Sequence, residues 1–253
     1  MIITLSPAKL INFETPVSIK EKTAPQFIEQ TNELMGILKK LPVVEIGSLM
    51  KINHQQTITV YQQIQAFDFD KTPQKQAGFT YNGIAYSGLN IRSFSKAEID
   101  YAQKHLVILS GLYGALRPLD MIKPYRLEMQ AELENGNGTN LYAFWNKTLT
   151  KYLSGCLSGD DKIWLNLMSN EYTKVITRKD LPKGTKIVTP VFKQQAANGY
   201  RQVVVYTKKA RGMMARFALK NKITDITHLK AFDEEGYTYS EQLSKGDNWV
   251  FIR

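Results

Sequence analysis

The segment HLVILSGLYGALRPLDMIKPYRLEM, residues 105–129, joins a short apolar run to a long loop crowded with charged residues. The apolar run has the length and composition of a buried strand. Connections between elements have a median length of roughly 4–6 residues, so a loop this long is expected to do more than connect. Gly111 and Gly114 permit a sharp turn or a close backbone approach, and Pro118 and Pro124 stiffen the loop. We therefore expect this rigid loop to form the wall of a site.

The charged residues of this loop support two interpretations. Arg117, Asp120, Arg126 and Glu128 suit a site for an anion or a sugar. They could equally form two internal ion pairs, Arg117 with Asp120 and Arg126 with Glu128, which would hold the loop in place without any ligand. The sequence alone leaves both interpretations open.

The chain alternates apolar runs with amphipathic segments, which predicts an α/β or α+β fold with a central mixed sheet flanked by helices. The predicted strands cover residues 2–5, 84–86, 106–109, 163–168, 186–192, 201–207 and 249–252. The predicted helices cover residues 25–40, 44–67, 95–105, 141–157 and 209–221.

Local signals support several of these elements. Ser95 and Glu98 have the spacing of a capping box at a helix start. Asn198 and Gly199 predict a hairpin turn between two neighbouring strands, which would make that pair antiparallel. No linker rich in proline, glycine or serine divides the chain, so we expect one domain over residues 1–253.

Composition excludes several classes of protein and site. No run approaches the ~20 apolar residues that cross a bilayer, and no signal-peptide pattern precedes the first strand. The single cysteine, Cys156, rules out an internal disulfide, so a cytoplasmic location is expected. The three histidines lie too far apart in sequence for zinc-ligand spacing. No nucleotide-binding glycine motif or metal-binding helix motif is present, and we expect neither a metal nor a cofactor.

The net charge is +10, an excess that suggests a polyanionic partner, most often nucleic acid or nucleotides. Six basic residues and no acidic one lie between positions 208 and 222. On a helix, Lys209, Arg216 and Lys220 would share one face and could follow phosphates. A basic face that merely contacts solvent is an equal alternative. The acidic run at positions 233–235 is expected to be exposed to solvent.

Polar residues gather where predicted strands end. In open α/β sheets, ligands bind at the carboxyl ends of the strands. If these strands are neighbours and parallel, one cleft would contain a set of six polar residues, namely Lys9, Ser110, Tyr113, Arg126, Lys208 and Arg211. Small polar residues at these ends could instead cap the following helices, and for Ser6 and Ser169 alone capping is the favoured interpretation.

A further element concerns nucleic acid. Residues 38–52 predict an N-terminal αα-hairpin that loosely resembles a helix-hairpin-helix, a motif that offers backbone N–H groups to a phosphate. The glycines usual in such a hairpin are missing. A plain packed helix pair is therefore favoured on the sequence.

Six motifs along the whole chain resemble the YaaA peroxide stress resistance family of bacteria. They are SPAK at 6–9, YSGL at 86–89, the loop at 109–129, NLMSNEY at 166–172, KKARGMMARF at 208–217 and FDEEGY at 232–237. The resemblance implies a cytosolic protein of the response to hydrogen peroxide that limits iron-driven damage. It also implies DNA binding through a positively charged cleft, a helix-hairpin-helix-like element and an unusual α/β fold. No enzymatic activity is firmly attached to the family.

Two hypotheses for the function follow. In the first, the chain is a DNA-binding protein with little sequence preference. Its phosphate contacts would be Lys208, Lys209, Arg211 and Arg216, with Lys9, Arg117 and Arg126 deeper in the cleft. In the second, the chain is an enzyme acting on a nucleotide, nucleobase or nucleic-acid lesion. Its candidate catalytic residues would be Lys9, Ser110, Tyr113, Asp120, Glu128 and Glu171, because phosphate tracking alone needs no carboxylates.

Overall fold

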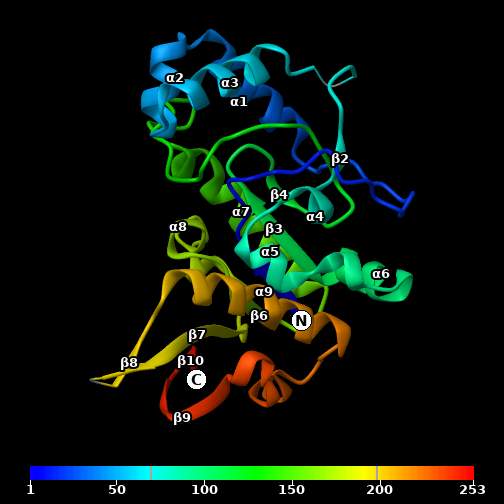
Figure 1. Cartoon of the computed structure of the whole chain (residues 1–253), viewed down its shortest axis with the longest axis vertical. Helices are drawn as coiled ribbons and strands as arrows, with labels where there is room; N and C mark the ends of the chain where they lie inside the picture. Colours follow the sequence, from blue (N-terminus) through cyan, green and yellow to red (C-terminus); the bar gives the residue numbers. More distant parts are fainter. Residues whose placement is uncertain (69, 198) are drawn as a thin grey trace.

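The computed structural model describes residues 1–68, 70–197 and 199–253 and contains a central mixed sheet flanked by helices (Figure 1). The strands are β1 (Ile2–Leu5), β2 (Lys75–Gln76), β3 (Leu106–Ser110), β4 (Gly114–Leu116), β5 (Met121–Ile122), β6 (Ile163–Leu167), β7 (Lys186–Ala196), β8 (Gly199–Arg201), β9 (Thr238–Lys245) and β10 (Asn248–Ile252). The predicted α/β class is therefore confirmed.

Helices cover the sheet and extend beyond it. The α-helices are α1 (Ile28–Lys40), α2 (Val43–Met50), α3 (His54–Gln65), α4 (Ala77–Thr80), α5 (Ile84–Leu89), α6 (Lys96–His105), α7 (Leu141–Ser158), α8 (Asn170–Thr173) and α9 (Val204–Lys220). Four 3-10 helices are described, η1 (Ile91–Ser93), η2 (Arg178–Asp180), η3 (Ile226–Ala231) and η4 (Glu234–Gly236). Helices α1 to α3 lie at one end of the molecule, and β9, β10 and η3 to η4 lie at the other (Figure 1).

The sheet follows the order β4-β3-β1-β6-β7-β10-β9, with β8 paired to β7. Strands β3, β1, β6, β7 and β10 run parallel to one another, whereas β4, β8 and β9 are antiparallel to their neighbours. Every residue of β1, β3 and β6 is buried. Continuous burial of this kind is typical of a parallel sheet covered on both faces. The carboxyl ends of β1, β3 and β6 consequently meet at one edge.

Several predicted elements are confirmed. The capping box is present at the start of α6, where the Ser95 side chain accepts from the Glu98 backbone N–H and the Glu98 side chain accepts from the Ser95 backbone N–H. The strands predicted at 2–5, 106–109 and 163–168 correspond to β1, β3 and β6. The predicted antiparallel hairpin is formed by β7 and β8, although Asn198 itself lies outside the described residues.

Three predicted elements are wrong. Residues 84–86 form the start of α5 and not a strand. The strand predicted at 201–207 ends at Arg201, and α9 begins at Val204. The long helix predicted at 44–67 is two helices, because Lys51 adopts a left-handed conformation with φ of 53° and Asn53 caps a new start. The two consecutive helices predicted over residues 38–52 are present as α1 and α2, but each of them packs against α3.

Within the described residues, no helix combines the length and the apolar character that a membrane-spanning segment requires.

Candidate functional site

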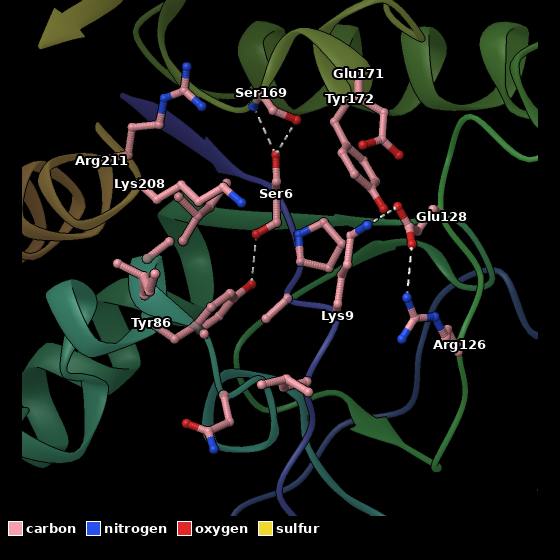
Figure 2. A pocket seen from close by; sticks show the side chains of 18 of the residues that line it. Ser6, Lys9, Tyr86, Arg126, Glu128, Ser169, Glu171, Tyr172, Lys208 and Arg211 are labelled. Carbon is pink, nitrogen blue, oxygen red and sulfur yellow. Dashed lines mark hydrogen bonds and ion pairs between the residues drawn. The ribbon is translucent and has the colours of Figure 1, made fainter. Parts of the chain in front are cut away.

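A pocket of about 560 Å³ opens at the carboxyl ends of β1 and β6 (Figure 2). Its floor is built where Ser6 follows β1 and Ser169 follows β6. The Ser6 hydroxyl donates to the Ser169 hydroxyl at 3.3 Å and accepts from the Ser169 backbone N–H at 2.9 Å. These bonds use the Ser169 oxygen as an acceptor, so its own O–H remains available as a donor. The two serines therefore join neighbouring strand ends rather than cap long helices.

One wall of the pocket comes from the crossing of α5 and α9. A Cβ at Gly212 would collide with the backbone carbonyl of Ala85, and one at Gly88 would collide with the carbonyl of Lys209. Only glycine permits this approach of the two helix backbones. The crossing places Tyr86 beside the pocket, where its hydroxyl donates to the Ser6 carbonyl at 3.0 Å.

Two cations of α9 line this same wall. Lys208 and Arg211 are three residues apart on the helix, and both line the pocket (Figure 2). Within the described part of the chain, neither side chain forms an ion pair, and the buried Arg211 Nε has no hydrogen-bond partner. Burial lowers the pKa of the Arg211 guanidinium. An anion in the pocket would satisfy both side chains.

The opposite wall carries two carboxylates (Figure 2). Glu128 accepts from Lys9 at 2.8 Å and from Arg126 at 3.5 Å. Gly111 allows the chain that bears Glu128 to lie against the end of β3, because a Cβ there would lie 2.5 Å from the Leu127 carbonyl oxygen. The predicted ion pair between Arg126 and Glu128 is thus confirmed. It lies in the lining of the pocket, where Lys9 also contacts Glu128.

Glu171 lies on the same side of the pocket as Glu128. Its carboxylate accepts from the backbone N–H of Gln130 at 3.3 Å. Burial raises the pKa of Glu171, and the negative charge of Glu128 raises it further. A carboxyl group with a raised pKa next to a second carboxyl group is suited to proton transfer or to accepting hydrogen bonds from a ligand.

A buried chain of hydroxyl groups lies behind the pocket. The hydroxyl of Tyr125, which lines the pocket, is 2.6 Å from that of Ser110 and 2.6 Å from that of Tyr81. Ser110 already accepts from the backbone N–H groups of Leu112 and Tyr113, so its own O–H is directed at Tyr125. Burial raises the pKa of Tyr125 to about 12. Ser110 therefore contacts Tyr125 and does not itself line the pocket.

The structure brings only some of the predicted site residues to the pocket. Six of them line the pocket, namely Lys9, Arg126, Glu128, Glu171, Lys208 and Arg211. Ser110 and Tyr113 are buried beneath it, and the Tyr113 hydroxyl accepts from the Lys123 backbone N–H. Although it lines the pocket, the Lys9 side chain is 59% exposed.

Arg117 and Asp120 lie outside the pocket. The Arg117 guanidinium donates to the Lys104 carbonyl and to the Cys156 sulfur. The Asp120 carboxylate accepts from the Arg117 backbone N–H at 2.7 Å and from the Thr23 hydroxyl at 2.5 Å. The predicted Arg117–Asp120 contact therefore runs through the backbone, and it pins the loop rather than binding a ligand.

The basic row predicted along α9 is present but largely neutralised. Lys209 forms an ion pair with Glu235, Arg216 pairs with Glu234, and Lys220 lies 3.6 Å from a Glu98 carboxylate oxygen. Of the acidic run, Asp233 and Glu235 are exposed as expected and Glu234 is half-buried, while Glu234 and Glu235 also pair with α9 cations. These carboxylates cover part of the basic face of α9.

Sequence reasoning missed several lining residues, among them Tyr86, Tyr125 and Gln56. Tyr86 was placed on a strand, although the glycine two positions later marks a close helix crossing. Among the described residues, no group of three or more histidine, cysteine, aspartate or glutamate side chains is arranged to hold a metal ion. The pocket thus offers cations, carboxylates and hydroxyl groups as its chemical resources.

Comparison with known proteins assigns the family. A family model described as "Peroxide stress protein YaaA" matches residues 1–243. The chain is 44% identical to a UPF0246 protein of Ralstonia pickettii and 43% identical to one of Ralstonia nicotianae, in each case over its whole length and 99% of the relative. It is also 44% identical to a UPF0246 protein of Shewanella denitrificans, over 98% of that relative. The chain therefore belongs to the YaaA family of peroxide stress proteins.

Proposed function

We propose that this peroxide stress protein binds DNA at the mouth of the pocket and thereby limits iron-driven oxidative damage to DNA and proteins. The observation that carries the proposal is a pair of pocket cations, Lys208 and Arg211, that form no ion pair with any residue the structure describes. Among the described cations predicted to contact DNA, Lys9 and Arg126 share Glu128, and those further along α9 are paired with η4. A phosphate would first contact Lys208 and Arg211.

A link to iron follows from the electrostatics of DNA. Duplex DNA holds a condensed layer of cations, and a protein that neutralises phosphates releases those cations. Ferrous iron held in this layer would generate radicals next to the bases. A bound protein of net charge +10 would displace it without any metal site of its own. The low sequence preference expected of phosphate contacts suits a general protective role.

A titration of labelled duplex and branched DNA at several salt concentrations tests this proposal. The informative variant is Lys208→Gln/Arg211→Gln. Each lost charge-assisted contact is expected to weaken binding by roughly tenfold, and the log–log salt slope should fall by about 2 in magnitude.

The matched control is Lys209→Gln/Arg216→Gln, which removes the same charge from the same helix at positions already paired with η4. It should weaken binding much less. Equal losses in the two double variants would show that only net charge matters. Unchanged affinity in Lys208→Gln/Arg211→Gln would contradict the proposal.

A second candidate function is supported by the carboxylates opposite the two cations. Phosphate contact does not require Glu128 or the raised pKa of Glu171. We propose, as the alternative, an enzyme that acts on a nucleotide, nucleobase or nucleic-acid lesion. Incubation with nucleotides and with damaged oligonucleotides, followed by mass spectrometry, should then reveal a product that Glu171→Gln fails to form. Identical product profiles with and without the protein would exclude this activity for the substrates tried.

A further inference from the structure

We infer that the pocket binds a single nucleoside monophosphate, with its phosphate against Lys208 and Arg211 and the amino group of its base against Glu128 and Glu171. The nucleotide is either free or an unpaired unit of a strand. This inference deepens the proposed function and rests on it, because both use the same two cations.

The first step of the argument is the separation of charge across the pocket. Figure 2 shows Lys208 and Arg211 on one side and Glu128 and Glu171 on the other, with Lys9 between them. A ligand that fits both walls is anionic at one end and donates hydrogen bonds at the other. A nucleoside monophosphate has this arrangement, because its phosphate and its base lie at opposite ends of the sugar.

The phosphate end of the pocket has unused donors. The Arg211 Nε is buried without a hydrogen-bond partner among the described residues, and the Ser169 hydroxyl accepts from Ser6 and can still donate. Lys208 is exposed at the rim. Guanidinium, ammonium and hydroxyl donors in the lining of one pocket are the groups that recognise a phosphate.

The base end of the pocket has acceptors. The Glu128 carboxylate lies 2.8 Å from the Lys9 ammonium and 3.5 Å from the Arg126 guanidinium, so it is held in position. The Glu171 carboxylate accepts from the Gln130 backbone N–H at 3.3 Å. Carboxylates accept from the exocyclic amino group of cytosine in known recognition. Adenine and guanine carry amino groups too, whereas uracil carries none.

Part of the pocket lining is apolar. It includes Pro7, Ala8, Leu127 and the ring of Tyr86, against which a base or sugar could pack. The volume of about 560 Å³ lies within the usual range for small-molecule sites.

Duplex DNA does not suit the acidic wall. It carries one negative charge per ≈1.7 Å of its axis, and these charges would be repelled by Glu128 and Glu171. A single nucleotide avoids that repulsion because its base faces the carboxylates. The duplex would therefore remain at the rim beside Lys208, and only one unpaired unit would enter.

Isothermal titration of the full chain with AMP, CMP, GMP and UMP tests the inference, with ribose 5-phosphate and the matching nucleosides as comparisons. We expect at least one amino-bearing monophosphate to bind tenfold or more tightly than ribose 5-phosphate, its own nucleoside and UMP. Arg211→Gln should reduce its affinity to that of the nucleoside. Glu171→Gln should reduce the affinity for the monophosphate towards the affinity for ribose 5-phosphate.

Lys209→Gln is the matched control, because Lys209 lies on the same helix outside the pocket. The affinity of this variant for the monophosphate should stay within twofold of that of the parent protein. If Arg211→Gln does not fold, Lys208→Gln tests the same end from an exposed position. Equal binding of ribose 5-phosphate and the nucleotides would overturn the inference, as would no nucleotide binding at all.

Duplex titrations on the same samples separate the two ideas. Nucleotide binding without duplex binding would contradict the proposed DNA function and support the inference. Duplex binding without nucleotide binding would support the proposed DNA function and contradict the inference.

Discussion

Gly212 shows how one missing side chain positions the pocket. A Cβ at this residue would collide with the backbone carbonyl of Ala85, which cannot move as a flexible side chain can. Gly212→Ala should therefore separate α5 from α9 and lower the free energy of unfolding by about 1–3 kcal/mol or more. Urea denaturation monitored by circular dichroism would measure the loss.

The matched control for that change is Gly36→Ala in α1. Gly36 is exposed, and a Cβ there would meet nothing within 4 Å. Alanine has the better helix propensity, so this variant should be more stable by about 0.5–1 kcal/mol. If both alanine variants stabilised the protein, the close crossing of α5 and α9 would be in error.

The Glu171 carboxyl group gives the pocket a pH signature. Burial raises its folded pKa above the unfolded value of 4.5. Below pH 4.5 both states are protonated, and as pH rises through the folded pKa the native state is increasingly destabilised by a buried charge. Glu171→Gln removes this charge. The free energy of unfolding of the variant relative to the parent should therefore rise with pH across the window that begins near 4.5 and then level off.

Denaturation at a series of pH values would measure this difference. Tyr142→Phe provides the control, because it removes a hydrogen bond to the Glu171 backbone carbonyl without altering the carboxyl group. It should shift the stability by about 1 kcal/mol at every pH in this window. A constant offset for Glu171→Gln as well would mean that the carboxyl group is not desolvated in the native state.

At the scale of elements, η4 acts as an electrostatic cover for α9. Glu234 and Glu235 pair with Arg216 and Lys209, and Glu235 also pairs with Arg253. Replacing both with glutamine should free two cations of α9 next to those of the pocket. DNA affinity should then rise, and the log–log salt slope should steepen by up to about 2.

A control for this change is Glu14→Gln/Glu241→Gln, which alters the net charge equally at two exposed positions away from α9. Long-range charge alone should raise affinity in both double variants, but the steeper salt slope belongs to the η4 variant. Equal slopes would show that η4 does not shield α9 from DNA.

The elements that could be predicted are those with a purely local cause. The Ser95 capping box and the apolar runs of β1, β3 and β6 are determined by residues that are adjacent in the sequence. The start of α9 could not be predicted from its local sequence, because its β-branched residues favour a strand. Val204 is 68% exposed there, and the helix forms because Met213 and Met214 further along are buried in the core.

The same distinction between local and long-range causes explains which site residues could be predicted. Lys9, Arg126 and the α9 cations were predictable from polar residues gathered near strand ends, although α9 contributes its pair from a helix and not from a strand end. Tyr86 was not predictable, since its position depends on Gly88 and Gly212 meeting across more than a hundred residues of sequence. The edge strand β9 was missed because its polar, mostly exposed residues lack alternation, and its pairing with β10 alone defines it.

At the scale of the whole molecule, one sheet links the two halves of the chain. Strand β6 pairs in parallel with β1 on one side and with β7 on the other. Helix α9 packs on β1, β6 and β7. The pocket uses residues from both halves, so its geometry depends on this continuity. The prediction of one domain over residues 1–253 thus becomes a prediction of cooperative unfolding.

Hydrogen exchange measured by mass spectrometry can test that cooperativity. Peptides from β6 and from β10 lie on either side of β7 in the sheet. If the sheet opens as one unit, the slowest amides of both strands should exchange with the same free energy, equal to that of global unfolding. Addition of a subdenaturing amount of urea should lower both values by the same slope, because both would report the same exposed surface. A lower free energy and a shallower slope for β10 alone would instead identify β7, β9 and β10 as a separate unit, which opens while α9 stays packed on α5, β1 and β6.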